Sequence, residues 1–164
     1  MEQERDRQVA TIGVYDADLP SFLAALEEAG ITAIVDVRQR RGVRGPEYAW
    51  ANAKRLQAAL AEAGVGYVHM KELAPTTAMR KLQYEVDDEL GEGKRSRTRL
   101  APGYVRAYSE GILDPADLGA LIELVDQGRP ALLCVERDPE ACHRSLIAAR
   151  LAEEFRADVI DLRP

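Results

Sequence analysis

The sequence predicts an α/β fold: a three-layer sandwich in which a mostly parallel five-stranded sheet carries helices on both faces. Short β-rich runs alternate with amphipathic stretches rich in Ala and Leu, and this alternation favours parallel strands joined by right-handed crossovers. The run at 33–37 is apolar without alternation, which is typical of a strand covered on both faces. Together these observations indicate a Rossmann-like arrangement of layers.

The β-rich runs and the helical periodicity place the elements of the first half of the chain. The predicted strands of the whole chain are residues 9–14, 33–37, 66–70, 130–135 and 159–162. Residues 19–29 carry apolar side chains at helical spacing and stop at Gly30, and residues 50–63 stop in the same way at Gly64. Glycine ends a helix readily because it adopts the left-handed conformation.

The second half begins with a polar segment, residues 71–100, which we expect to be an insertion or lid that is at most partly helical. Two Asp-Pro pairs follow, at Asp114-Pro115 and Asp138-Pro139. An aspartate before a first-turn proline is typical of a helix start. The sequence therefore predicts three further helices, at 104–113, 115–127 and 139–155.

Length and composition indicate a single domain. We expect a flexible N-terminus at 1–8 and one α/β domain at 9–164, because 164 residues with 46% hydrophobic content support one core. No apolar stretch reaches the roughly 20 residues of a membrane span, and the charged start lacks a signal-peptide core. We therefore expect a cytoplasmic protein with no membrane partner. A net charge of −6 also argues against general affinity for nucleic acid.

Polar and reactive side chains follow four of the predicted strands. In an open α/β sheet this edge binds ligands, so we expect these side chains to share one site. They are Tyr15 after the first strand, Asp36 and Arg38 at the second, His69 at the third, and Cys134, Glu136 and Arg137 at the fourth.

The segment 134–146, C-V-E-R-D-P-E-A-C-H-R-S-L, is the most informative motif. In a helix that starts at Pro139, Arg144 lies on the inward apolar stripe. A buried guanidinium needs a carboxylate, an anionic ligand or backbone carbonyls. Cys142 is expected about 160° away from Arg144 around that helix. Arg144 and Cys134 are therefore stronger candidates than Cys142.

Each candidate also has a structural interpretation. Buried free cysteines usually pack as small apolar side chains, so this interpretation is favoured over chemistry for Cys134. Arg144 is able to pair with Asp36 or Glu136 as a structural bridge. The imidazole of His69 is compatible with a hydrogen-bonded core position. These alternatives stay open at the level of sequence.

Two groups of basic residues stand out in this acidic chain. The first, Arg38, Arg40, Arg41 and Arg44, is denser than a solvated face requires. Guanidinium groups bind phosphate or carboxylate through two parallel hydrogen bonds, so this group is a candidate anion site. The alternative interpretation is a mobile charged loop. The second group, Lys94, Arg95, Arg97 and Arg99, lies among acidic residues, and we expect it to be a solvated, flexible segment.

Four motifs of the chain form a recognisable set: T-I-G at 11–13, V-D-V-R at 35–38, Y-V-H-M with E-L after it at 67–73, and L-L-C-V-E-R…C-H-R-S-L-I-A from 132 onward. Together they resemble the motifs of the bacterial family catalogued as domain of unknown function 488. The likeness runs from about Val9 to Leu162. Where members commonly read T-I-G-H-S, this chain has Val14-Tyr15, so a histidine after the first strand is missing. The resemblance implies the fold and assigns no activity.

A weaker likeness is to rhodanese-type domains, which also place D-V-R at a strand end and a cysteine at another strand end before a helix. Their tight loop surrounds the thiolate with backbone N–H groups and lowers its pKa. Here ten positions separate Cys134 from Arg144, and Glu136, Asp138 and Glu140 intervene. This longer acidic loop disfavours an activated thiolate at Cys134.

The leading functional hypothesis is an enzyme or binding protein whose pocket holds an anionic ligand: a phosphate, a nucleotide or a nucleic-acid fragment. Arginine side chains would clamp the anion, and the N-terminus of the helix near Pro139 would add its dipole. The expected catalytic residues are Cys134, Glu136 and His69, and the expected ligand-binding residues are Arg38, Arg137, Arg144, His143, Asp36 and Tyr15.

Two other hypotheses belong to different classes. One is a thiol- or metal-dependent or rhodanese-like enzyme that uses Cys134. Cys142 and His143 are adjacent on the predicted helix and diverge there by about 100°, so no metal site is predicted. The other is a non-catalytic module that binds nucleic acid or protein through the arginines at 38–44. The sequence names no cofactor and no oligomeric state.

Overall fold

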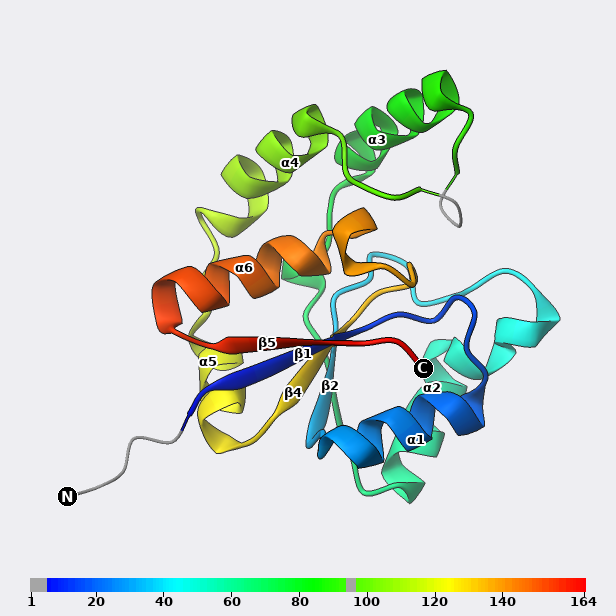
Figure 1. Cartoon of the computed structure of the whole chain (residues 1–164), viewed down its shortest axis with the longest axis vertical. Helices are drawn as coiled ribbons and strands as arrows, with labels where there is room; N and C mark the ends of the chain where they lie inside the picture. The colour runs from blue at the N-terminus through cyan, green and yellow to red at the C-terminus, as the bar shows by residue number, and fades with distance from the viewer. Residues whose placement is uncertain (1–5, 94–96) are drawn as a thin grey trace.

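The computed structural model describes residues 6–93 and 97–164, and five parallel strands form its sheet (Figure 1). The strands are β1 (Gln8–Ile12), β2 (Ala33–Asp36), β3 (Gly66–His69), β4 (Pro130–Leu133) and β5 (Asp158–Leu162), in the spatial order β3-β2-β4-β1-β5. All residues of β2 and β4 are buried, as their continuous apolar sequences require. The predicted α/β fold class is confirmed.

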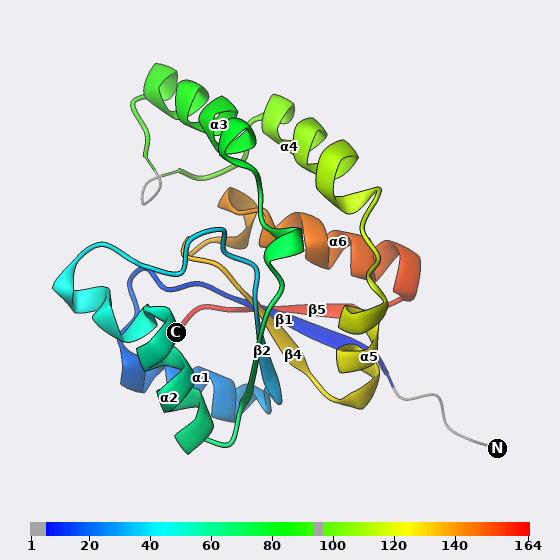
Figure 2. The same ribbon diagram turned by 180° about the vertical axis from the view of Figure 1, so that it is seen from behind.

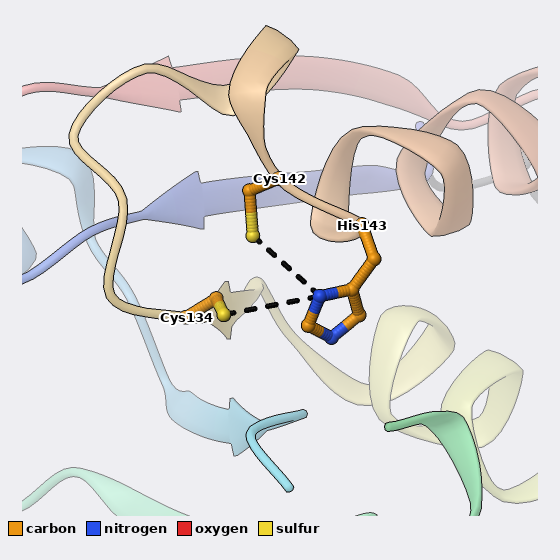
Figure 3. A group of neighbouring side chains, drawn as sticks. All are labelled: Cys134, Cys142 and His143. Atoms are coloured by element: carbon orange, nitrogen blue, oxygen red, sulfur yellow. Dashed lines mark hydrogen bonds between the residues drawn. The ribbon is translucent and has the colours of Figure 1, made fainter. Parts of the chain in front are cut away.

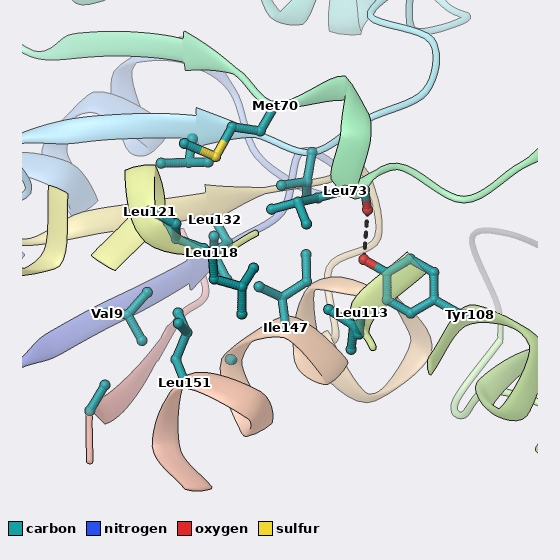
Figure 4. Close-up of a cluster of buried hydrophobic side chains, with 14 of the residues drawn as sticks. Val9, Met70, Leu73, Tyr108, Leu113, Leu118, Leu121, Leu132, Ile147 and Leu151 are labelled. Carbon is teal, nitrogen blue, oxygen red and sulfur yellow. Dashed lines mark hydrogen bonds between the residues drawn. The ribbon is translucent and has the colours of Figure 1, made fainter. Parts of the chain in front are cut away.

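Helices cover both faces of this sheet (Figures 1 and 2). α1 (Leu19–Ala29) and α2 (Ala53–Glu62) cover one face, and α5 (Gly119–Gln127) and α6 (Arg144–Phe155) cover the other. Neighbouring strand residues serve opposite faces: Ala10 and Ile34 pack toward α1 and α2, while Val9 and Val35 belong to the cluster in which Ile147 of α6 is buried (Figure 4). The three layers follow from this alternation.

The polar segment 71–100 contains a regular α-helix. After the short turn η2 (Lys71–Leu73) it forms the 14-residue helix α3 (Thr77–Leu90), which packs against α4 (Pro102–Tyr108). Thr76 caps α3 through a hydrogen bond to its first turn, and Gly91 ends it with a left-handed φ of 68°. The segment is thus partly helical, within the expected limit, and most charges of α3 lie on its exposed face. Figures 1 and 2 show α3 and α4 beyond α6, farther from the sheet.

The first Asp-Pro pair does not start a helix. Asp114 and Pro115 form a turn after η3 (Ser109–Leu113), a π-helical continuation of α4. The helix α5 begins later, at Gly119, whose backbone N–H donates to Asp117 Oδ1 at 2.9 Å. The aspartate that assists this helix start is therefore Asp117.

The second Asp-Pro pair starts only the short 3₁₀ turn η4 (Pro139–Ala141). Cys142 is then extended, with φ −140° and ψ 148°, and α6 begins at Arg144. The expectation of one continuous helix from Pro139 is wrong. A similar 3₁₀ turn, η1 (Pro46–Ala51), precedes α2.

The sheet begins one residue before the predicted first strand. Gln8 already pairs with Asp158 of β5, and Arg7 forms an ion pair with Asp126 at 2.8 Å. The remaining N-terminal residues 1–5, and Lys94 and Arg95 of the second basic group, lie outside the described residues. Within the described ranges, no helix has the length and apolar character needed to cross a bilayer.

Candidate functional site

A pocket of about 600 Å³ opens beyond the carboxyl ends of β1, β2 and β4, at the edge where open α/β sheets bind ligands. The loops after these three strands form one part of its wall. α3 and the segment that leads into α4 form the rest. The polar segment 71–100 therefore supplies part of the pocket.

The pocket wall carries an excess of positive charge. Five arginines line it, and within the described ranges Glu136 supplies the only lining carboxylate. The arginines are Arg38, Arg40, Arg44, Arg80 and Arg97. The whole chain has a net charge of −6, so the pocket is positive in an otherwise acidic protein. A positive pocket attracts anions.

Arg38 is neutralised by its neighbour Asp36. The guanidinium donates from Nε and Nη2 to the two carboxylate oxygens at 2.9 and 2.8 Å, and from Nη1 to the carbonyl oxygen of Ala51. Tyr67 donates to the same carboxylate at 2.5 Å. Burial alone would lower the pKa of Arg38, but hydrogen bonding and charge attraction from Asp36 raise it above its ordinary value. The D-V-R motif thus builds a buried pair that supports the pocket wall.

Arg97 is also neutralised, and it is 7% exposed rather than solvated as its sequence context predicts. Its guanidinium binds Asp87 at 2.8 Å, donates to the carbonyl oxygen of Ala141, and lies 3.6 Å from Glu136 Oε1. Gln83 donates to the same Asp87 carboxylate at 2.8 Å. Arg97 thereby ties α3 to the loop that precedes α6.

Arg80 differs from both because its partners are neutral. It is half-buried and donates to Gln39 Oε1 and to the Tyr84 hydroxyl, each at 2.7 Å. Its guanidinium carbon lies 5.6 Å from the centre of the Tyr84 ring. In the described parts of the chain, no carboxylate forms an ion pair with Arg80. Arg80 therefore brings an uncompensated positive charge to the pocket.

The structure does not bring Arg137 and Arg144 to the pocket wall. Arg144 is fully buried and donates to the backbone carbonyls of Glu136 and Arg137 at 2.5 and 2.9 Å. Of the three partners considered for this guanidinium, the structure selects backbone carbonyls. Arg137 is half-exposed and lies 4.0 Å from Asp138. The three-arginine arrangement expected from sequence is therefore not assembled.

Gly13 explains the T-I-G motif at the end of β1. A Cβ atom on this residue would lie 2.0 Å from the carbonyl oxygen of Glu136. Only glycine permits the loops after β1 and β4 to approach so closely. Tyr15, two residues further on, then reaches the pocket wall.

His69 remains at the sheet edge but is not among the lining residues. Its Nε2 lies 3.0 Å from the carbonyl oxygen of Arg38. A carbonyl only accepts hydrogen bonds, so Nε2 carries the proton and donates it. This contact favours the structural interpretation of His69.

The second part of the site is the sulfur–imidazole cluster, Cys134, Cys142 and His143 (Figure 3). His143 Nδ1 lies 3.9 Å from the sulfur of Cys134 and 3.7 Å from that of Cys142. All three residues are buried from bulk solvent and line the pocket. The expected divergence of Cys142 and His143 is wrong, because both precede the first residue of α6 and Cys142 is extended.

A backbone contact fixes the orientation of the His143 ring. Nε2 lies 2.8 Å from the carbonyl oxygen of Val37, so it carries the hydrogen and leaves the Nδ1 lone pair toward both sulfurs in the neutral ring. Burial alone would lower the pKa of His143, but Cys134, the Val37 carbonyl and Glu136 raise it above its ordinary value.

The Cys134 thiol is protonated at neutral pH in this environment. The neighbouring thiol of Cys142, together with burial, raises the pKa of Cys134 to about 12. A thiolate nucleophile needs the opposite shift. The cluster therefore gives no support to a rhodanese-like activated thiolate.

Sequence reasoning missed the contribution of α3. Arg80, Gln83 and Tyr84 all line the pocket, and none was a candidate. Two signals were present: Thr76 and Gly91 mark the helix ends, and the pairs Arg80–Tyr84 and Gln83–Asp87 have i, i+4 spacing. The charge density of the segment concealed them.

The chain matches a known protein family. The model of the family described as Domain of unknown function DUF488 matches residues 18–151. This range runs from the start of α1 into α6, so it contains the loops after β2 and β4 and the whole sulfur–imidazole cluster. Neither a curated protein nor a solved structure matches the chain significantly.

Proposed function

Because the chain belongs to the DUF488 family, whose description assigns no activity, we propose a function from the pocket itself: it binds a small organic anion that carries a phosphate or carboxylate group. The observation that carries this proposal is the excess of arginine over carboxylate in the pocket wall. Planar guanidinium groups suit both kinds of anion because they donate two parallel hydrogen bonds.

Arg80 is the residue expected to contact the anion. Its two hydrogen bonds to Gln39 and Tyr84 hold the guanidinium in place and leave other N–H donors for a ligand. Since both partners are neutral, its charge is available to a ligand. Arg40, which is exposed on the opposite part of the wall, is the second expected contact.

The dimensions of the pocket favour a small molecule over a polymer. Ligand pockets for small molecules have volumes of about 300–1,000 Å³, and this pocket falls within that range. Tyr15, Tyr84 and Tyr104 add aromatic surface for the organic part of the ligand. A nucleic-acid polymer instead needs an extended basic surface, and the net charge of −6 disfavours one.

A thermal-shift series tests this proposal with inorganic phosphate, a nucleoside monophosphate, citrate and a short oligonucleotide. We expect at least one of the three small anions to stabilise the wild type, and Arg80→Gln to remove that stabilisation. Arg55→Gln is the matched control, because Arg55 is an exposed arginine on α2 outside the pocket.

Two results would overturn the proposal. One is the absence of stabilisation by every small anion at low salt. The other is equal stabilisation of the wild type and Arg80→Gln. Stabilisation by the oligonucleotide alone would support the interaction module instead.

A further inference from the structure

We propose that Cys134, Cys142 and His143 form a binding site for a soft divalent cation, with Zn²⁺ as the best-fitting ion. The site lies in the pocket wall, but the inference does not depend on anion binding. It rests on the geometry of three donor atoms, on the contacts that orient them, and on their chemistry.

The distances between the donors approach those of a tetrahedral site. With Zn–S bonds of about 2.3 Å and Zn–N bonds of about 2.0–2.1 Å, a sulfur and a nitrogen bound to one zinc lie about 3.6 Å apart. The two sulfur–Nδ1 distances here are 3.9 and 3.7 Å, and all three donor atoms lie within 4.8 Å of one another. Two sulfurs on one tetrahedral zinc lie about 3.8 Å apart, so the two cysteine side chains would close by up to about 1 Å to accommodate the ion.

The His143 ring is held in the orientation that a metal ligand needs. Its Nε2 hydrogen bonds to the carbonyl oxygen of Val37, which is the usual outer contact of a metal-binding histidine. The ring also packs edge-on against Tyr108, with 5.5 Å between centroids. Tyr108 is itself fixed by a hydrogen bond to the carbonyl oxygen of Leu73.

The backbone around Cys142 is fixed on both sides. Its N–H donates to the carbonyl oxygen of Pro139, and its own carbonyl accepts from the backbone N–H and the hydroxyl of Ser145. Arg97 holds the preceding carbonyl, that of Ala141. These contacts keep Cys142 extended, and the extended conformation brings its sulfur toward His143.

The donor chemistry selects the class of ion. Thiolate and imidazole favour zinc and similar soft cations, whereas Mg²⁺ and Ca²⁺ prefer oxygen ligands. Two thiolates balance the two positive charges of the ion, so the bound site needs no further counter-charge.

The fourth coordination position would face the pocket. Over residues 6–93 and 97–164, no fourth Cys, His, Asp or Glu joins the three donors, and all three line the pocket. Zinc sites with three protein ligands keep the fourth position for water or a ligand. The structure therefore assigns an open metal site, in contact with the space proposed for the anion.

Elemental analysis is the first test. Wild-type protein expressed with zinc and purified without chelator is expected to contain close to one zinc per chain. Cys142→Ser and His143→Gln are expected to lose more than about 100-fold in zinc affinity, which exceeds the loss usual for an outer-contact change. His69→Gln is the control, because His69 is the other histidine of the chain and lies outside the cluster. It should retain zinc.

Cobalt substitution supplies a second readout, which does not depend on the variants folding. Metal-free wild type titrated with Co²⁺ should develop a thiolate-to-cobalt charge-transfer band and the intense visible bands of tetrahedral coordination. The inference is overturned if the wild type holds only traces of zinc and Co²⁺ produces no thiolate band. A Cys134–Cys142 disulfide in protein purified under nitrogen would also overturn it.

The variant Arg80→Gln separates this inference from the proposed function. It should retain zinc while it loses anion-induced stabilisation. Loss of both properties in this variant, with the fold intact by circular dichroism, would contradict the independence of the two sites.

Discussion

His143 donates its Nε2 hydrogen to the carbonyl oxygen of Val37, 2.8 Å away. The two residues are 106 positions apart in the chain, and the contact joins the V-D-V-R motif at the end of β2 to the C-H-R motif at the start of α6. It also turns Nδ1 toward Cys134 and Cys142. The carboxyl end of β2 therefore positions the ring on which the sulfur–imidazole cluster depends.

The Arg97–Asp87 pair makes a large contribution to stability. Asp87→Ala leaves the buried Arg97 without its closest carboxylate, and removing one partner of a buried pair costs about 3–5 kcal/mol. We expect a loss near the lower end of this range, since Glu136 remains 3.6 Å from the guanidinium. Urea denaturation measures the effect. Asp88→Ala, an exposed neighbour on α3, should change stability by less than about 0.5 kcal/mol, and equal losses in the two variants would contradict the assignment.

Gly13→Ala should be strongly destabilising. The added Cβ would lie 2.0 Å from a backbone oxygen, that of Glu136, so the loops after β1 and β4 would have to separate. Overpacking of this kind costs about 1–3 kcal/mol or more. Gly103→Ala is the control, because a Cβ there meets no atom within 4 Å and alanine is the better helix former. Thermal denaturation of both variants provides the measurement, and similar melting temperatures would refute the close approach.

Asp18 gives α1 a pH-dependent cap. A hydrogen bond from the backbone N–H of Ser21, 2.8 Å from the carboxylate, lowers the pKa of Asp18 below its ordinary value. A group whose folded pKa is depressed stabilises the fold above its unfolded pKa and loses that contribution as the pH falls through the folded value. The stability difference between the wild type and Asp18→Ala should therefore shrink below a pH of about 4. Denaturation at several pH values tests this prediction. Glu27→Ala is the control, because Glu27 is an exposed residue of the same helix. A stability difference between the wild type and Asp18→Ala that stays constant with pH would exclude the cap.

The sequence was sufficient to predict the three layers of the fold and which face of α6 is buried. Periodicity and glycine stops located the five strands, and Arg144 is buried on α6 as the helical stripe predicts. These features depend on local patterning, which a single sequence records. The same patterning correctly placed the carboxyl ends of the strands beside one another.

The errors arose where tertiary contacts override a local signal. Asp138-Pro139 is a valid helix-start signal, but only a short turn follows it, and Cys142 is then extended. Two hydrogen bonds hold this conformation: Ser145 donates to the carbonyl oxygen of Cys142, and Arg97 donates to that of Ala141. Because Cys142 is extended, its sulfur lies close to the imidazole of His143. The expectation that Arg97 is solvated is wrong for a similar reason. Its partner Asp87 is ten positions away, on a helix that the polar sequence did not reveal.

Titration calorimetry of the wild type, Arg80→Gln and Arg55→Gln, with the anion that stabilises the protein most, tests the central claim most directly. We predict that Arg80→Gln weakens binding by about tenfold or more, which corresponds to the loss of one charge-assisted hydrogen bond of about 1.5–3 kcal/mol, and that Arg55→Gln binds as the wild type does. Equal affinities of the wild type and Arg80→Gln would contradict the account.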